Sequence, residues 1–151
     1  GFSSPTIYVN GVSSSAARVN EWNHIVITTT TSFSASAITI GKQSSNFFAG
    51  TMDDFRIYSK VLSANDVLRV YGLGGTTYAN KSLSSNSKLT NGLIGWWTFD
   101  GSEMTLTTST DKSGNNNNAT RTNGPLAGIG KIGQGLYFDG INTSSNFPKN
   151  H

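Results

Sequence analysis

The chain has no cysteine, few charged residues and no long apolar run. Without cysteine it can form neither disulfide bonds nor thiolate metal sites, although this absence leaves the cellular compartment open. No apolar stretch approaches the roughly 20 residues that a membrane-spanning helix needs, and no basic start followed by an apolar core marks a signal peptide. We therefore expect any such segment to lie outside these 151 residues.

Charge gives no sign of a polyanionic partner. The net charge is +3, but the eleven Lys and Arg residues are scattered singly rather than gathered in a run or along one helix face. We therefore expect no binding to nucleic acid.

Residues that carry out chemistry are also scarce. Glycoside hydrolysis needs two carboxylates across a cleft, and the only Glu residues, Glu21 and Glu103, lie in no recognisable motif. A nucleophile triad is unsupported, because no GxSxG motif occurs and His24 has no second histidine near it except His151. We predict that the chain is not an enzyme and that His24 has a structural role.

Ser, Thr and Asn are abundant: they fill 55 of the 151 positions, whereas charged residues make up only 13%. This balance suits many short strands joined by polar turns better than long surface helices. The chain is long enough for one β-sandwich with a real core and too short for two complete ones. The composition predicts an all-β fold.

The first part of the chain carries strand patterns. Alternation across "NHIVITTTT" predicts a half-buried strand, and "AITIG" repeats the pattern more briefly. "TIYV" ends at Asn10-Gly11, a dipeptide that favours a tight hairpin turn. In "TMDDFRIY" the alternation breaks near Asp53, which predicts a bulge. Beyond the break, the two faces are Phe55 with Ile57 and Arg56 with Tyr58.

One helix is predicted in "SANDVLRVYGLG". Ser63 is a good N-cap, Asp66 can return a bond to it, and Gly72 or Gly74 ends the helix. A helix of about nine residues is too short to be stable alone, so it must lie against a sandwich edge. Its expected apolar face consists of Val67, Leu68 and Tyr71.

Residues 73–92 read as a linker because they are rich in Gly, Ser, Thr and Asn and show little periodicity. Strands then resume in "GLIGWWTFD", near "ATRT" and in "GKIGQGLYFDG". Leu136 and Phe138 are expected on one face and Tyr137 and Asp139 on the other. In the first of these strands one face holds Leu93, Trp97 and Phe99, and the other holds Ile94, Trp96 and Asp100. Trp22 and Trp97 are predicted core residues.

Segments from both parts of the chain resemble one known domain. "NGLIGWWTFDG", "DKSGNNNNAT" and "GKIGQGLYFDG" resemble its opening half. "TIYVNG", "EWNHIVITT" and "ITIGKQSSNFFAGTMDDFRIYSKVLSANDVLRVY" resemble its closing half. The domain is the laminin-G-like (LamG-like), concanavalin A-like jelly roll that bacteria use in tandem on secreted and surface proteins. The resemblance implies a two-sheet antiparallel β-sandwich with one short helix.

The two halves occur in reversed order. This interpretation divides the chain into a C-terminal half (1–72), a Ser/Thr/Gly-rich linker (73–92) and an N-terminal half (93–151), from an adjacent repeat or a permuted unit. Several strands that the family places between the halves are absent. Because the first and last strands of a jelly roll commonly lie close together, "GWWTFD" can pair beside "DDFRIY", within one chain or across neighbouring chains. An open edge of this kind invites strand donation between subunits.

The resemblance also implies a calcium ion, which in such domains often lies between the first strand, the following loop and the last strand. It would place Asp100, Asp111 and one of Asp53 or Asp54 around the ion, because calcium takes six to eight oxygen ligands. The alternative is that these carboxylates hold turns. Asp100 and Asp139 would then start Asp-Gly turns, and Asp111 would bond its own loop backbone.

Three aromatic residues, Trp96, Tyr58 and Tyr137, are expected on the face opposite the core. Such rings can stack against a sugar. The alternative is that they cover edges, linkers or the helix.

These observations predict a non-catalytic extracellular or cell-surface LamG-like repeat for adhesion, display or filament assembly. Its partners would be neighbouring copies of itself or adjacent repeats. The alternative function is a calcium-supported, lectin-like module that binds carbohydrate. The junction style also resembles tandem-repeat surface proteins of candidate-phylum bacteria.

Overall fold

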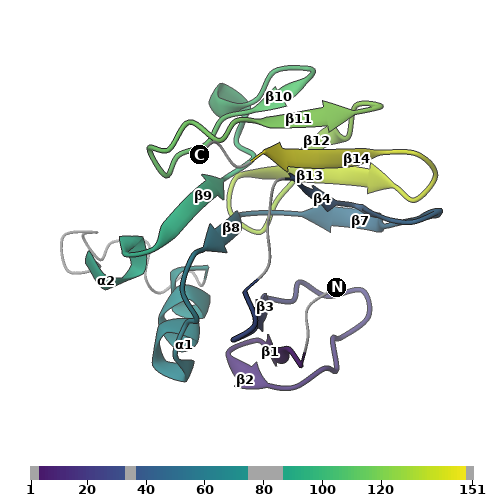
Figure 1. Cartoon of the computed structure of the whole chain (residues 1–151). Coiled ribbons are helices and arrows are strands. Elements are labelled where there is room, and N and C mark those ends of the chain that lie inside the picture. The colour runs from purple at the N-terminus through teal and green to yellow at the C-terminus, as the bar shows by residue number, and fades with distance from the viewer. Residues whose placement is uncertain (1–3, 33–36, 75–86, 149–151) are drawn as a thin grey trace. The chain divides into compact units, whose positions relative to one another are not determined.

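The computed structural model describes residues 4–32, 37–74 and 87–148, which are mostly β-strands in antiparallel sheets (Figure 1). The strands belong to two compact units, and each unit is built from two separate stretches of chain. Unit 1 comprises Gly1–Ser34 with Tyr58–Gly92, and unit 2 comprises Ala35–Ile57 with Leu93–His151. The predicted all-β class is confirmed, and the multiple antiparallel sheets are consistent with a jelly-roll β-sandwich.

Unit 1 contains a three-stranded sheet in the order β2-β1-β3. Asn10 and Gly11 have φ angles of 52° and 85°, the left-handed conformation that a two-residue hairpin turn between β1 and β2 requires. The predicted hairpin is therefore confirmed. The strands are β1 (Thr6–Val9), β2 (Val12–Ser13) and β3 (Ile25–Thr28).

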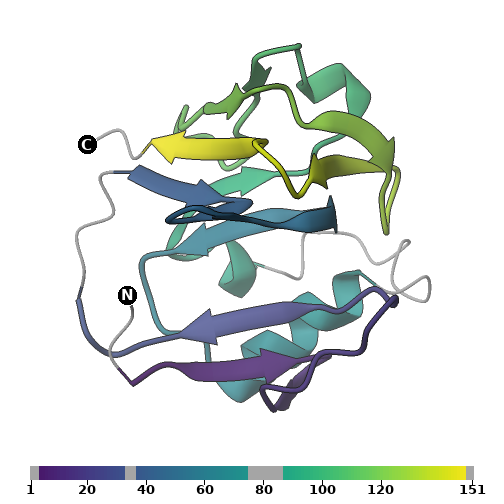
Figure 2. The same cartoon turned by 90° about the vertical axis from the view of Figure 1, so that its right-hand side faces the viewer.

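Helix α1 (Ala64–Leu73) lies behind this sheet in Figure 2. The Ser63 hydroxyl accepts from the Asp66 N–H, and the Asp66 side chain accepts from the Ser63 N–H, so the predicted capping box is present. Gly74 is the C-cap. The core of unit 1 consists of Leu62, Val67, Val70 and Leu89, with Tyr8, Val26, Tyr58 and Leu73 packed against it.

The predicted apolar face of α1 is partly wrong. Val67 is buried with Val70, whereas Leu68 and Tyr71 are exposed. Val67 and Val70 are three residues apart and therefore point the same way. Leu68 and Tyr71 form the next row around the helix and lie close to the turn at Gly11 instead.

The predicted linker is also partly wrong. Residues 87–90 form a short helix, α2 (Ser87–Thr90), and Leu89 is buried in the core of unit 1. A single apolar side chain gains free energy on burial without giving the sequence any periodicity, so the pattern carried no signal. Residues 75–86 of the predicted linker lie outside the described residues.

Unit 2 contains two larger sheets, with strand orders β10-β11-β14-β4 and β12-β13-β7, and two strand pairs, β5-β6 and β8-β9. Those from the first part of the chain are β4 (Ala37–Ile40), β5 (Lys42–Gln43), β6 (Asn46–Phe47), β7 (Ala49–Met52) and β8 (Phe55–Tyr58). Those from the second part are β9 (Leu93–Trp97), β10 (Thr108–Ser109), β11 (Ala119–Thr122), β12 (Leu126–Ile129), β13 (Gln134–Asp139) and β14 (Ser144–Pro148).

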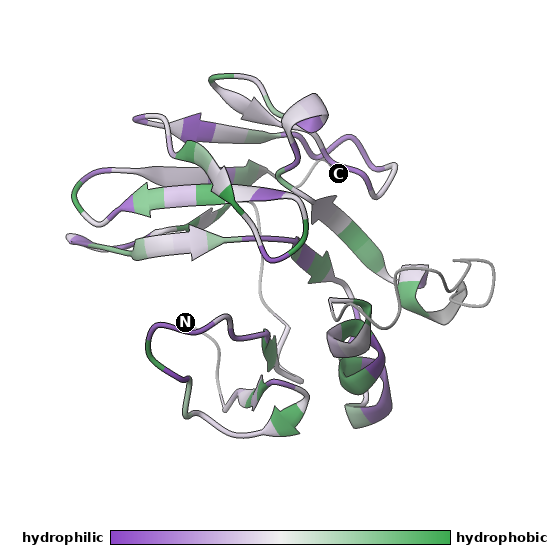
Figure 3. Cartoon of the chain, turned by 180° about the vertical axis from the view of Figure 1, so that it is seen from behind, coloured by the Kyte–Doolittle hydropathy of each residue, from purple (hydrophilic) through white to green (hydrophobic). Residues whose placement is uncertain are grey.

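The core of unit 2 is aromatic. Phe147 lies at its centre, with ring centroids 4.5 Å from Trp97 and 4.8 Å from Phe55. Along β13 the buried Leu136 and Phe138 alternate with more polar positions, as the colours of Figure 3 show. Trp97 is a core residue as predicted, and the other fully buried aromatic residues are Phe99, Phe138 and Phe147.

The prediction for Trp22 is wrong. Its side chain is 41% exposed and belongs to neither core cluster. It lies in a turn before β3 in which Asn23 binds the backbone carbonyls of Arg18 and Glu21. These bonds fix the turn as a surface loop and leave the indole outside the strand alternation.

Strands from the two parts of the chain pair with each other within unit 2. Strand β7 pairs antiparallel with β13, with Thr51 opposite Tyr137, and β4 pairs antiparallel with β14, with Ile38 opposite Phe147. Strand β8 pairs with β9, so "FRIY" and "LIGWW" lie side by side in one chain, as the reversed order allows. The compact units therefore do not follow the division at residues 73–92, which remains an interpretation by family likeness.

Candidate functional site

The alternation of β7 and β8 breaks at two adjacent acids, Asp53 and Asp54. Asp54 has a φ of 56°, a left-handed conformation that is uncommon outside glycine. The predicted irregularity near Asp53 is therefore present. It lets two neighbouring carboxylates bind different partners.

Asp54 forms a cluster with Arg56 and Trp96. The indole Nε1–H of Trp96 donates to Asp54 Oδ1, and Arg56 Nη2 lies 2.8 Å from Asp54 Oδ2. The Arg56 guanidinium also lies 4.8 Å from the centroid of the Trp96 ring, a cation–π contact. The polar atom of Trp96 and one face of its ring are thus already engaged.

Asp53 and Asp100 bind one turn from the segments that follow two different strands, β7 and β9. Asp53 Oδ2 accepts from the Ile132 N–H at 2.8 Å, and Asp100 Oδ1 accepts from the Gln134 N–H at 3.0 Å. The approach is close at Gly133, where φ is 65° and a Cβ atom would lie 2.2 Å from Asp100 Oδ1. Only glycine at this position lets the carboxylate reach the turn.

The pKa of Asp53 is raised from 3.8 to about 6. Burial of the carboxylate is the largest cause, and the charges of Asp54 and Asp100 raise the pKa further. The hydrogen bond from Ile132 lowers it but does not compensate. Asp53 is therefore an acid whose negative charge is poorly stabilised in this structure.

Asp111 is buried and saturated with hydrogen bonds. It accepts from the N–H groups of Trp96 (2.9 Å), Ser113 (2.8 Å) and Asn117 (2.9 Å), and from the Ser113 hydroxyl (2.8 Å). Burial alone would raise its pKa, but these bonds outweigh burial and the pKa lies below its ordinary value. Its oxygens stabilise the fold as acceptors.

The loop after Asp111 covers the edge of β9 with side-chain amides. Asn117 Nδ2 donates to the Ile94 carbonyl at 2.8 Å, and Asn115 Nδ2 donates to the carbonyls of Ile94 and Leu93. The Trp97 indole in turn donates to the Asn117 carbonyl at 3.0 Å. Sequence reasoning missed this role, for which the Asn run at 115–118 was the available signal.

Asp139 holds the turn between β13 and β14. One of its oxygens accepts from the N–H groups of Ile141 (2.9 Å) and Asn142 (3.1 Å) and from the hydroxyl of Thr143. The first two bonds are the main reason why its pKa falls to about 2. This geometry agrees with the alternative in which Asp139 starts an Asp-Gly turn.

The predicted calcium ligands are only partly brought together. Asp53 and Asp100 meet at one turn, whereas Asp54 is engaged by Arg56 and Trp96, and Asp111 by its own loop. Within residues 4–32, 37–74 and 87–148, no three His, Cys, Asp or Glu residues form a group that could hold a metal ion.

The three predicted sugar-stacking residues have different surroundings. Tyr58 is half-buried against the core of unit 1, and Trp96 lies beneath Arg56. Tyr137 is 48% exposed and lies between Leu126 and Thr51, its partners on the neighbouring strands. Of the three, Tyr137 is the one whose aromatic ring is exposed to solvent.

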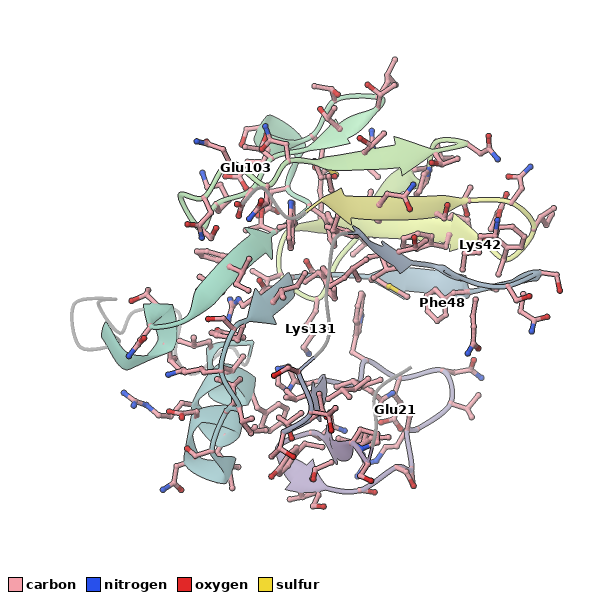
Figure 4. All side chains as sticks on the ribbon, in the orientation of Figure 1. Glu21, Lys42, Phe48, Glu103 and Lys131 are labelled. Atoms are coloured by element: carbon pink, nitrogen blue, oxygen red, sulfur yellow. The ribbon has the colours of Figure 1, made fainter. Side chains whose placement is uncertain are left out.

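The two Glu residues serve in separate ion pairs (both are labelled in Figure 4). Glu103 lies 2.6 Å from Lys112 Nζ and also accepts from the Thr98 hydroxyl. Glu21 lies 3.3 Å from Arg18, and both of these side chains are exposed. Because they belong to different units, nothing places them as a carboxylate pair.

A shallow hollow of about 320 Å³ lies at the β5-β6 hairpin of unit 2. Lys42 Nζ lies 5.3 Å from the centroid of the Phe47 ring beside it. No carboxylate, histidine or hydroxyl lines this hollow, and Lys42 is its one ionisable lining residue. Its lining residues are Gly41, Lys42, Gln43, Asn46, Phe47 and Phe48.

In the part of the chain that the structure describes, no helix has the length and apolarity that crossing a bilayer requires.

Comparison with known proteins finds a family match in the first part of the chain. Residues 3–68 match the family model Laminin_G_3, described as the concanavalin A-like lectin/glucanases superfamily. No curated protein and no solved structure was found to match the chain. The matched segment includes Asp53, Asp54 and Tyr58, whereas Trp96, Asp100, Asp111 and Tyr137 lie beyond it. Over residues 3–68, the chain is therefore similar to the Laminin_G_3 family of the concanavalin A-like lectin/glucanases superfamily.

Proposed function

We propose that the chain is a non-catalytic LamG-like repeat of an extracellular bacterial surface or filament protein, in which it mediates adhesion or assembly. The family match supports the LamG-like module. Domains of this family are commonly extracellular binding modules, and the absence of cysteine is compatible with that location.

One observation carries the proposal: the carboxylates of unit 2 are used to hold the module together. Asp111 accepts four hydrogen bonds from its own framework, Asp139 holds a turn, and Asp54 joins Arg56 to Trp96. Carboxylates in such positions have stabilising partners within the module. A module stabilised by its own loops, with exposed strand edges, is suited to contacts with other chains.

Two measurements on the full chain test this function together. Sedimentation velocity over a concentration series should show self-association, and a glycan array should show no selective binding. A chain that stays monomeric and binds one glycan class selectively would contradict the proposal and favour the second candidate below.

The second candidate is a calcium-supported carbohydrate-binding module. Two observations favour it: Asp53 and Asp100 converge on one turn while the charge of Asp53 is poorly stabilised, and Tyr137 presents an open ring. A divalent cation beside Asp53 would supply the missing positive charge. The two acids would need backbone or water oxygens to complete the coordination.

Chelation tests the calcium part of this candidate. A bound ion stabilises the folded state, so the Tm should fall on adding EDTA and recover with calcium. The Asp53→Asn variant should lose that response, whereas the Asp66→Asn variant, at the helix cap of unit 1, should keep it. An unchanged Tm after chelation excludes calcium binding. Unchanged glycan binding by Tyr137→Ala excludes stacking of a sugar on the Tyr137 ring.

A further inference from the structure

Strand β3 is an edge strand without the charged side chains or proline that commonly protect against pairing. It is the outer strand in the order β2-β1-β3 of the residues that the structure describes. Natural edge strands are commonly guarded by charged side chains, proline, bulges or short length. The opposite edge, β2, has only two residues, whereas no Asp, Glu, Lys, Arg or Pro occurs from Trp22 to Gly41.

The outward backbone groups of β3 can be assigned from its register. The Asn10 N–H donates to the His24 carbonyl at 2.8 Å, and Tyr8 and Val26 are opposite each other. In an antiparallel ladder, hydrogen-bonded pairs alternate with non-bonded pairs, so Val26 and His24 face β1. The N–H and C=O groups of Ile25 and Ile27 therefore point away from β1, toward the open edge.

The side chains of the same two residues are also exposed. Ile25 is 54% and Ile27 is 48% exposed, on the sheet face opposite Val26, which packs toward the core of unit 1. At Ile25 and Ile27 the strand thus presents both outward backbone N–H and C=O groups and exposed aliphatic side chains. Such a strand is suited to pairing with another uncharged, β-branched strand.

We propose that β3 pairs antiparallel with β3 of a second copy of this chain, about a two-fold axis at Val26. This register places Ile25 opposite Ile27 of the other copy, and Ile27 opposite its Ile25. The four outward N–H and C=O groups of each copy then bond across the axis, and the facing isoleucines form two aliphatic pairs. The result is a continuous sheet with the order β2-β1-β3-β3-β1-β2.

A second copy fits this edge better than an unrelated partner. The edge is neutral, and the nearest charges on its N-terminal side, Arg18 and Glu21, are paired with each other at 3.3 Å. The edge therefore carries no charge that would select a charged partner, whereas the two-fold register gives each outward N–H a C=O of the other copy. This inference rests on the proposed assembly function and identifies the surface that would carry it.

Proline at position 27 tests the edge directly. Ile27→Pro removes only an outward N–H, which an edge strand tolerates, and leaves the ladder to β1 intact. One hydrogen bond is lost per copy, so the dimer should weaken by about tenfold or more in sedimentation velocity. Ile27→Thr keeps the N–H and the β-branched shape, and its dimer should be weakened less than that of Ile27→Pro. Far-UV circular dichroism checks that both variants fold.

A charge-swap pair keeps the test decisive if the proline variant unfolds. The double variants Ile25→Lys/Ile27→Lys and Ile25→Glu/Ile27→Glu should each be monomeric, because like charges then face each other. Mixed in equal amounts, the two variants should form a heterodimer. Failure of the mixture to associate overturns the proposal.

Two further outcomes would refute the inference in different ways. A wild-type chain that stays monomeric at every concentration refutes both this inference and the proposed function in self-assembly. A folded Ile27→Pro variant that dimerises as the wild type does refutes the β3 edge alone, and assembly through another surface then stands.

Discussion

The carboxylate of Asp54 accepts a hydrogen bond from the indole Nε1–H of Trp96, and so joins the residues before β8 to β9. These two strands come from the parts of the chain before and after residues 73–92. With Arg56 bound to the same carboxylate at 2.8 Å, one acid stabilises the point where these two parts of the chain meet.

We expect Asp54→Asn to destabilise unit 2. The substitution keeps the shape but removes the charge opposite Arg56, whose side chain is largely buried, so the free energy of unfolding should fall by about 1–3 kcal/mol. Urea unfolding monitored by tryptophan fluorescence measures the loss. Glu21→Gln, in an exposed ion pair, is the control and should change stability by less than about 0.5 kcal/mol.

Substitution of Asp111 should be more disruptive than its place in a polar loop implies. Asp111→Ala removes the acceptor of four hydrogen bonds and leaves three backbone N–H groups without it, so we expect a loss of about 2–4 kcal/mol. The same urea titration measures it. A loss below about 0.5 kcal/mol would show that water replaces the carboxylate and that the loop does not support β9.

Asp53 predicts an unusual pH dependence. Its folded pKa of about 6 is above the unfolded value of 3.8, so between these values the folded state binds more protons and its stability falls as pH rises. Asp53→Asn should therefore be more stable than the wild type at pH 7, with a difference that shrinks below pH 4. Urea midpoints measured from pH 3.5 to 7.5 test the sign. A less stable variant at pH 7 would contradict it.

The aromatic core predicts a contrast between two residues of unit 2. Phe147→Ala empties a fully buried site against Trp97 and Phe55 and should cost about 3–5 kcal/mol. Tyr137→Ala, on the exposed face of β13, should cost less than about 1 kcal/mol. Similar losses for both variants would mean that Tyr137 is covered in solution.

Local features were predictable from the sequence because neighbouring residues determine them. Asn10-Gly11 takes the left-handed turn, Ser63 and Asp66 form the capping box, and Leu136 alternates with Tyr137 on β13. Each feature depends on backbone preference or on a spacing of two or three residues. The all-β class follows from the same short-range patterns.

The remaining features depend on partners far away in the chain. Nothing near Asp111 indicates that it would accept from Trp96, and the isolated Leu89 does not show that it reaches a core. Asp100, Asp111 and one of Asp53 or Asp54 were expected around one ion. Asp53 and Asp100 reach the same turn, whereas Asp111 is engaged by its own loop. Such pairings follow from tertiary packing, which single-sequence periodicity does not encode.

We expect the two halves of the chain, before and after residues 73–92, to close on each other within one chain. Thr51 on β7 and Tyr137 on β13 are opposite each other, and the chain has no native cysteine to compete. Thr51→Cys with Tyr137→Cys, oxidised at low protein concentration, should form a disulfide within each chain, because cross-strand Cβ atoms lie at bonding range. Thr51→Cys with Leu126→Cys, one strand further away, should form none and is the control.

Non-reducing electrophoresis with mass spectrometry reads the result. A monomer that contains the cross-link between positions 51 and 137 is the predicted outcome. A disulfide-linked dimer, with position 51 of one chain bound to position 137 of another, would show that the halves are exchanged between subunits and would contradict the claim.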